Sequence, residues 1–239
     1  MKIAILGAGN MAFSLLAPLK KELSQHEIKI FTPTYTRAHG LAQELGGLAV
    51  KAIDELQGQD VYLLACKPQQ LDQLSLQLSS LVTKNCAIVS ILAAITTQQL
   101  SEKLGTSKVL RLMPNTPCMV AAGVISMYAS EEFPDELKNQ WKSYLGTTAR
   151  VIEFDKEEMI DLTTPQLGSG PAYIFELARI LTNSLQAAGI SQEDAEELIT
   201  QMIYGASVLL KESKLGPTEL RDQVTSKKGI TEAALNCLS

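Results

Sequence analysis

A glycine-rich turn near the N-terminus is the first segment whose residue types and spacing could do chemistry. Gly7-Ala-Gly9-Asn-Met-Ala12 has the spacing G-x-G-x-x-A and directly follows the apolar run Lys2–Leu6. In such a turn the first glycine makes the bend, the second lets the backbone approach a pyrophosphate, and the third small residue lets a helix pack on a strand. Free N–H groups at the start of that helix favour phosphate. The pattern predicts a dinucleotide site that includes Gly7, Gly9, Asn10 and Met11; a purely structural strand–helix turn is the alternative.

The end of the next expected strand bears on which nucleotide binds. NAD sites usually place an acidic residue there, on the ribose 2′-hydroxyl. Here the strand Glu27–Phe31 continues as Thr32-Pro-Thr-Tyr-Thr-Arg37, without an acid. Hydroxyls and a guanidinium suit a 2′-phosphate instead. We therefore expect NADPH rather than NADH as the preferred cofactor, with Thr32 and Arg37 in its site; a solvated Arg37 at a helix start is the alternative.

Two further segments stand where expected strands end, the place at which doubly wound sheets bind ligands. Lys67-Pro68 follows the run Asp60–Ala65, and Pro114-Asn-Thr-Pro117 follows Val109–Leu112. Because proline fixes φ and donates no N–H, the second segment is predicted to leave the sheet as rigid backbone without ladder pairing. We expect Lys67 and Pro68 in the cofactor site, with Lys67 as a cation near phosphate or substrate carboxylate; a solvated lysine is the alternative. Asn115 and Thr116 are expected to present side chains and amides at fixed positions; a rigid connection that only ends the strand is the alternative.

The elements that must position these residues alternate between strands and helices. Short apolar runs predict strands at 2–6, 27–31, 60–65, 86–91 and 109–112, and the segments between them predict helices at 37–45, 70–81 and 97–104. This alternation is typical of an α/β fold with a doubly wound parallel sheet. We expect residues 1–151 to form an NAD(P)-binding Rossmann domain.

The second part of the chain has a different pattern. Strand-like runs stop after Phe154, and apolar residues then recur at helical spacing in two long stripes. Pro171 is expected to begin the first helix and Gly189 to end it, and Ser191 with Asp194 reads as the N-cap of the second. Residues 152–239 are therefore predicted to be an all-helical domain. Its exposed apolar stripes would have to pack on one another or on a second subunit.

The composition excludes several classes of protein. The chain has 239 residues and a net charge of −5, which argues against a nucleic-acid or anionic-membrane partner. No stretch approaches the roughly 20 apolar residues of a membrane span. Four scattered cysteines and two histidines predict no metal site and fit a reducing compartment. We expect a cytoplasmic protein.

Five segments, taken in order, resemble those of the pyrroline-5-carboxylate reductase family. They are G-A-G-N-M-A from Gly7, A-C-K-P-Q from Ala65, M-P-N-T-P from Met113, G-S-G-P-A-Y from Gly168 and D-Q-V-T-S-K-K-G-I-T from Asp222. The resemblance spans nearly the whole chain. It implies reduction of 1-pyrroline-5-carboxylate to L-proline with NADPH or NADH, the last step of proline biosynthesis. It also implies a homodimer or larger homo-oligomer built through the C-terminal helices.

The resemblance also implies roles for particular residues. The segment at Asn115, Thr116 and Pro117 would lie against the nicotinamide. The substrate carboxylate would be held by a backbone-rich loop with Ser226, Gly229, Ile230 and Thr231, since consecutive N–H groups bind anions. The Thr231 hydroxyl is the candidate catalytic group, as a hydrogen-bond partner of the imine nitrogen; a helix N-cap is its alternative role. A protonated imine is a strong electrophile, so orientation of the two reactants can supply much of the catalysis.

The chain departs from the family pattern mainly on the substrate side. The loop that usually reads S-P-G-G-T-T has Lys227-Lys228 in place of Pro-Gly, and Ala94 stands where glycine is usual. Leu167 replaces a small residue and is expected to crowd the pocket. Two alternatives therefore stay open: a related NADP-dependent imine or keto reductase with another substrate, and a catalytically silent nucleotide-binding homologue.

Overall fold

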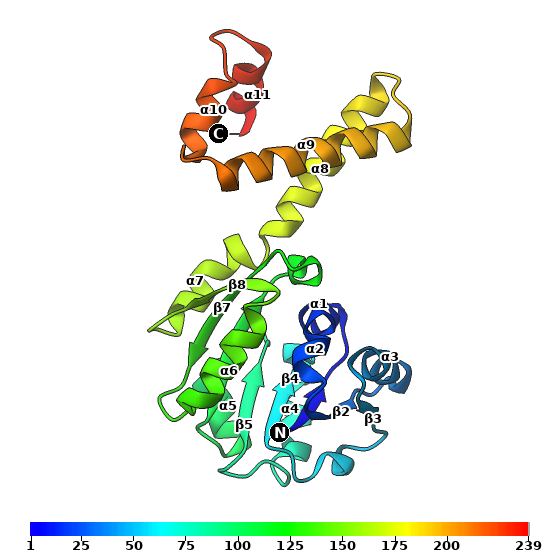
Figure 1. Cartoon of the computed structure of the whole chain (residues 1–239), viewed down its shortest axis with the longest axis vertical. Coiled ribbons are helices and arrows are strands. Elements are labelled where there is room, and N and C mark those ends of the chain that lie inside the picture. The colour runs from blue at the N-terminus through cyan, green and yellow to red at the C-terminus, as the bar shows by residue number, and fades with distance from the viewer. Residues whose placement is uncertain (239) are drawn as a thin grey trace. The chain divides into compact units, whose positions relative to one another are not determined.

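An eight-stranded sheet is the framework of the first of two compact units, Met1–Pro171 and Ala172–Ser239, in the computed structural model (Figure 1). The structure describes residues 1–238. The strand order is β3-β2-β1-β4-β5-β6-β7-β8. The strands are β1 (Lys2–Leu6), β2 (Glu27–Phe31), β3 (Leu48–Ala49), β4 (Val61–Leu64), β5 (Ala87–Ser90), β6 (Val109–Pro114), β7 (Gly123–Ala129) and β8 (Ala149–Glu153).

The sheet is mostly parallel, and the five expected strands are all confirmed. One pair departs from the parallel arrangement, because β7 runs antiparallel to β6. The connection between them is too short for the crossover that a parallel pair needs. It consists of a 3₁₀ turn, Thr116–Val120, followed by Ala121, whose φ of +54° reverses the chain. Strands β3, β7 and β8 were not expected from the sequence.

Helices cover both faces of this sheet, as expected of a doubly wound fold. One face packs against α1 (Asn10–Leu16), α3 (Tyr35–Leu45) and α6 (Asp135–Leu145), and the other against α4 (Leu71–Leu78) and α5 (Thr97–Leu104). Strand β1 alternates between the two cores, with Ile3 and Ile5 in one and Ala4 and Leu6 in the other. Burial on both faces explains why this strand reads as a continuous apolar run.

The expected helices of this unit are confirmed, with differences at their ends. Helix α5 has the expected bounds, α3 begins two residues early, and α4 is shorter than predicted because a 3₁₀ turn, Pro68–Gln70, precedes it and it ends at Leu78. Helix α6 was missed. Short turns complete the unit: η1 (Ala17–Leu19), α2 (Lys20–Leu23) and η2 (Ile53–Leu56).

Helix α7 (Glu158–Leu167) packs on β6 and β7 and therefore belongs to the first unit. Its Ile160 is fully buried. The two compact units divide after Pro171, well beyond the boundary at 151 that the change of pattern in the sequence suggests. The two positions of the boundary differ because α7 is helical, like the second unit, but packs on the sheet of the first.

The second unit is entirely helical within the part of the chain that the structure describes. It comprises most of α8 (Gly170–Ala187), with α9 (Gln192–Glu212), α10 (Pro217–Gln223) and α11 (Ile230–Leu238). The expected signals at its helix ends are confirmed: Pro171 is the second residue of α8, Gly189 has φ +93°, and the Ser191 hydroxyl accepts a hydrogen bond from the Asp194 amide. None of the helices described is both long and apolar enough to cross a membrane.

The apolar stripes of α8 and α9 are largely exposed in the single chain. Among the described residues from Ala172 onward, Ala195 is the one that is classed as buried. Phe175 is 63% exposed and Leu198 is 55% exposed. Such apolar area on one chain marks an interaction surface.

Candidate cofactor and substrate sites

A cavity of about 740 Å³ lies beyond the carboxyl ends of β1, β2, β4, β5 and β6. This is the position at which a doubly wound sheet binds nucleotides. The cavity brings together eight of the residues that the sequence predicts to bind cofactor: Gly7, Gly9, Asn10, Met11, Thr32, Arg37, Lys67 and Pro68. Other lining residues come from the ends of β5 and β6, namely Ile91, Leu92, Ala93, Met113 and Pro114.

The glycine turn that lines the cavity has the geometry that a pyrophosphate needs. Gly7 has φ +114°, and its amide donates a hydrogen bond to the Phe31 carbonyl at 2.9 Å. A Cβ at Gly7 would lie only 2.6 Å from the Cys66 amide nitrogen, so the turn must pass this close to β4. Gly9 is extended, with φ −83°, and a Cβ there would have no atom within 4 Å. The backbone at Gly9 is thus open to a ligand.

The charges around the cavity favour an anionic ligand. Arg37 and Lys67 line it, and none of its described lining residues is acidic. Helix α3 also starts at the cavity, next to Thr34, and has no acidic residue in its first turn. Its free N–H groups and dipole add to the attraction for phosphate. Burial raises the pKa of the Cys66 thiol in the cavity wall, which keeps this side chain neutral.

The Met-Pro-Asn-Thr-Pro segment differs from its expected form. Strand β6 continues through Pro114, which pairs with Ile125 of β7, so the prediction that the chain leaves the sheet without ladder pairing is wrong. Met113 and Pro114 line the cavity, whereas Asn115, Thr116 and Pro117 are not among its lining residues. A contact of these three with the nicotinamide stays a prediction.

Asn115 makes structural hydrogen bonds that its sequence context did not reveal. Its side chain is almost fully buried. Its Nδ2 donates to the Leu167 carbonyl at 3.0 Å, and its Oδ1 accepts from the Val124 amide at 2.9 Å. The side chain therefore joins the end of β6 to both β7 and α7.

The expected substrate loop lies in the second unit. The Gly229 amide donates to the Ser226 carbonyl at 3.0 Å, and the Lys228 amide donates to a carboxylate oxygen of Glu232 at 2.6 Å. Thr231 is the second residue of α11, which begins at Ile230, so its alternative role as a helix N-cap is wrong. One loop amide, that of Lys228, thus binds a carboxylate, here one from the same chain.

Two of the departures from the family pattern occupy backbone conformations that favour glycine. Lys228 and Ala94 both have φ +59°. An L-residue pays roughly 1–2 kcal/mol for the left-handed region. Leu167, the third departure, is half-buried at the end of α7, and its carbonyl is the acceptor for Asn115.

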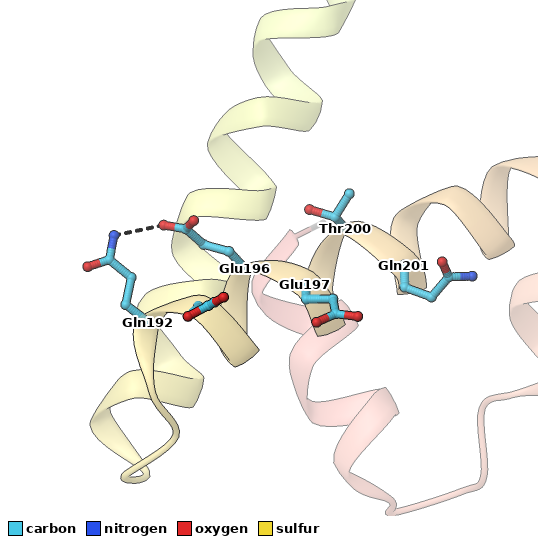
Figure 2. Close-up of a pocket in the computed structure, with 6 residues that line it drawn as sticks. Gln192, Glu196, Glu197, Thr200 and Gln201 are labelled. Carbon is cyan, nitrogen blue, oxygen red and sulfur yellow. Dashed lines mark hydrogen bonds between the residues drawn. The ribbon is translucent and has the colours of Figure 1, made fainter.

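A second, shallow pocket lies on the polar face of α9 (Figure 2). Gln192 points toward Glu196, and its Nε2 donates to that carboxylate at 2.8 Å (Figure 2). Its described lining contains Glu193, Glu196 and Glu197 but no cation. Three carboxylates repel a nucleotide or a carboxylate substrate, so the cavity of the first unit is the candidate cofactor site. Among the described residues no group of three or more His, Cys, Asp or Glu side chains could hold a metal ion.

Comparisons with known proteins agree with this assignment. A family model described as pyrroline-5-carboxylate reductase dimerisation matches residues 157–239, and one described as NADP oxidoreductase, coenzyme F420-dependent, matches residues 2–94. A pyrroline-5-carboxylate reductase from Pseudomonas aeruginosa is 34% identical over 98% of this chain and 87% of its own length.

Solved structures extend the likeness to the whole fold. The 1-pyrroline-5-carboxylate reductase of Streptococcus pyogenes is 28% identical, with a TM-score of 0.85 over 100% of this chain and 90% of that one. The pyrroline carboxylate reductase of Plasmodium falciparum, solved with NADP bound, has the same TM-score at 22% identity, over 100% and 89% of the two chains, and shows likeness of fold alone. The glycine turn, the cavity and a relative that matches almost the full chain lead to one conclusion: the chain belongs to the pyrroline-5-carboxylate reductase family.

Proposed function

We propose that this chain reduces 1-pyrroline-5-carboxylate to L-proline by hydride transfer from NAD(P)H. The observation that carries the proposal is the match to the P. aeruginosa pyrroline-5-carboxylate reductase across 98% of the chain, which includes both units. The cavity supports it, because its glycine turn, its two cations and its lack of described acidic lining residues suit a dinucleotide.

The residues of the cavity would hold the cofactor in a defined direction. The pyrophosphate would meet the turn at Gly7 and Gly9 and the N-terminus of α1. The adenosine ribose would lie over the end of β2, at Thr32 and Arg37. Because the strand order continues from β1 through β4 and β5 to β6, the nicotinamide would then lie toward Met113. When bound, the nicotinamide supplies the hydride.

The remaining task of the chain is to hold the substrate against the nicotinamide. We assign the substrate carboxylate to the loop with Ser226, Gly229 and Ile230, whose neighbouring Lys228 amide binds the Glu232 carboxylate in the free chain. The Thr231 hydroxyl would hydrogen-bond the imine nitrogen and retain the proton there, which keeps the carbon electrophilic. Orientation of this kind contributes several kcal/mol without a strong side-chain acid.

NADPH is the preferred cofactor in this proposal. Arg37 lines the cavity beside Thr32, at the strand end where an acidic residue would favour NADH. A hydrogen bond to a charged group contributes roughly 1.5–3 kcal/mol, so Arg37→Ala should raise the KM for NADPH by about 10- to 150-fold. The KM for NADH, which has no 2′-phosphate, should change little. Equal losses for both cofactors would place Arg37 outside the phosphate site.

The test of the function is oxidation of NADPH, followed at 340 nm, with the purified protein and 1-pyrroline-5-carboxylate. Rapid oxidation that Thr231→Val slows, with NADPH affinity unchanged, is the expected result. Binding of NADPH without oxidation would instead favour a related imine or keto reductase or a silent homologue. A panel of other cyclic imines and keto acids separates those two.

The proposal also covers assembly and location. The dimerisation family match and the exposed stripes of α8 and α9 support a homo-oligomer formed through the C-terminal helices. The four cysteines are free thiols, which fits the reducing cytoplasm that we propose as the location.

A further inference from the structure

Helix α7 is fixed to the Rossmann sheet at three points along its length. Near its start, the Arg111 guanidinium binds Glu157 at 3.1 Å and Asp161 at 2.6 Å. In its middle, the Thr163 hydroxyl lies 3.3 Å from that of Ser126 on β7. At its end, the Leu167 carbonyl accepts the hydrogen bond from Asn115. The helix therefore has a defined position on the sheet.

Two of these three anchors, Arg111 and Asn115, lie on β6 and directly after its end. Arg111, Met113 and Asn115 alternate along the chain, so Arg111 and Met113 project from the same face of β6. The end of α7 lies next to Met113, which lines the cofactor cavity, since a Cβ at Gly168 would lie 3.8 Å from the Met113 side chain. The position of α7 is thus coupled to the cavity wall at the end toward which the nicotinamide would lie.

Burial of the charged Arg111 side chain carries a large desolvation penalty, so stability alone does not account for it. Its side chain is 0% exposed, and its Nε finds no hydrogen-bond partner within the described part of the chain. Glu157 is shared with α5, since it also accepts from the Thr97 amide at 2.7 Å and hydroxyl at 2.8 Å. Buried ion pairs often contribute less to stability than apolar residues of similar size. A buried guanidinium that joins three elements instead specifies one arrangement of them.

We propose that Arg111 is a positioning residue for the reductase reaction. Its ion pairs set α7 on the sheet, and α7 in turn holds Asn115 and the cavity wall at Met113 in the geometry that hydride transfer needs. The residue does not touch substrate or cofactor. The inference rests on the proposed function for its effect on turnover, and on the contacts above for its effect on structure.

The test compares Arg111→Met and Asp161→Asn with a matched control, Glu153→Gln. Glu153 makes ion pairs with Lys138 and Lys142 of α6, on the other face of the sheet, so its loss also removes a contact between a strand and a helix. Because a misplacement of about 1 Å can cost about 100-fold in rate, Arg111→Met should lower kcat at least about tenfold. The dissociation constant of NADPH should stay within about twofold, and the isotope effect with NADPH deuterated at the transferred position should rise. The control should match the wild type in all three.

A merely structural role gives a different result. A kcat per folded protein within about twofold of the wild type, with an unchanged isotope effect, would overturn the inference. So would parallel losses of NADPH binding, turnover and melting temperature. Asp161 is half exposed, so Asp161→Asn should fold normally and show a smaller loss in the same direction.

Hydrogen exchange separates failure of this inference from failure of the proposed function. The amides of residues 158–167 and of Val124 should exchange faster in Arg111→Met than in the wild type, while those of β1 should not change. This holds whether or not the wild type turns over 1-pyrroline-5-carboxylate. Unchanged protection of α7 and Val124 would overturn the inference, whereas an inactive wild type would overturn the proposed function alone.

Discussion

Replacement of Gly9 by alanine should strongly weaken cofactor binding while leaving the fold intact. Gly9 has φ −83° and ψ 178°, which any L-residue adopts, and an added Cβ would have no neighbour within 4 Å. As the N-cap of α1, alanine is disfavoured relative to glycine by up to about 1 kcal/mol. The reduced freedom of the unfolded chain returns about 0.4–1 kcal/mol. The net change in the free energy of unfolding should therefore stay within about 1 kcal/mol.

The same methyl group would stand where the pyrophosphate approaches the backbone. Loss of one or two hydrogen bonds to a charged group costs roughly 2–4 kcal/mol. That corresponds to a rise of about 30- to 700-fold in the dissociation constant of NADPH, at 1.4 kcal/mol per factor of ten. Isothermal titration with NADPH measures the binding, and thermal unfolding without cofactor measures the fold, for which we expect a shift in Tm below about 4 °C.

Gly7→Ala supplies the comparison, because it should destabilise the fold itself, whereas Gly9→Ala should weaken cofactor binding alone. Its Cβ would collide with the Ala65 carbonyl and the Cys66 amide, and its φ of +114° strains any L-residue. We expect a loss of several kcal/mol in stability for Gly7→Ala, by strain and overpacking together. If Gly9→Ala binds NADPH within about threefold of the wild type, the assignment of the pyrophosphate to this turn is refuted. If it melts as low as Gly7→Ala, the claim that the fold tolerates this methyl group is refuted.

Three further predictions concern single side chains. Burial and the nearby N-terminal ammonium lower the pKa of His26. Below about pH 6.5 the unfolded chain therefore takes up a proton that the folded state resists, and stability should fall as the pH is lowered. The difference in unfolding free energy between pH 7.5 and pH 5.5 should be smaller in His26→Gln than in the wild type. The raised pKa of Cys66 predicts slow alkylation by iodoacetamide at pH 7 and further protection by NADPH, measured by peptide mass mapping; alkylation that NADPH does not slow would place the cofactor elsewhere. Lys228→Gly should relieve the backbone strain at φ +59°. After the entropic cost of glycine is subtracted, the helical unit should be stabilised by up to about 1 kcal/mol. A lower melting temperature would show that the lysine side chain stabilises the unit by more than the strain destabilises it.

Local patterns made the cofactor half of the fold predictable. Strands such as β1 are buried on both faces and read as apolar runs, and the glycine turn carries its own conformational signature at Gly7. Helix α5 has the bounds expected from its sequence because Thr96 and Gly105 mark its two ends: the Thr96 hydroxyl caps the start, and Gly105 ends the helix at φ +72°. In each case the determining contacts lie within a few residues.

The missed features depend on contacts that are distant in the sequence. Strand β8 lies at the edge of the sheet, has no fully buried residue and contains Arg150, so it lacks the apolar run of a central strand. The reversal into β7 depends on Ala121 in a conformation that its residue type disfavours. Asn115 reads as a polar loop residue, whereas its partners Val124 and Leu167 lie 9 and 52 residues further along. Helix α6, in contrast, had a readable pattern, since Trp141 and Leu145 are buried at helical spacing.

The exposed apolar faces of α8 and α9 have a consequence for how the protein assembles during and after its synthesis on the ribosome. The Rossmann unit is synthesised first, and at about 5–20 residues per second the helices that follow Ala172 take several seconds more to emerge. In the assembly proposed above, pairing between chains would therefore come late, through helices that contribute nothing to the buried core of the first unit. A copy with a misfolded Rossmann unit would still display these faces. Defective copies would then be built into assemblies with sound ones, so a damaging substitution at Gly7 should act dominantly in a cell that makes both forms.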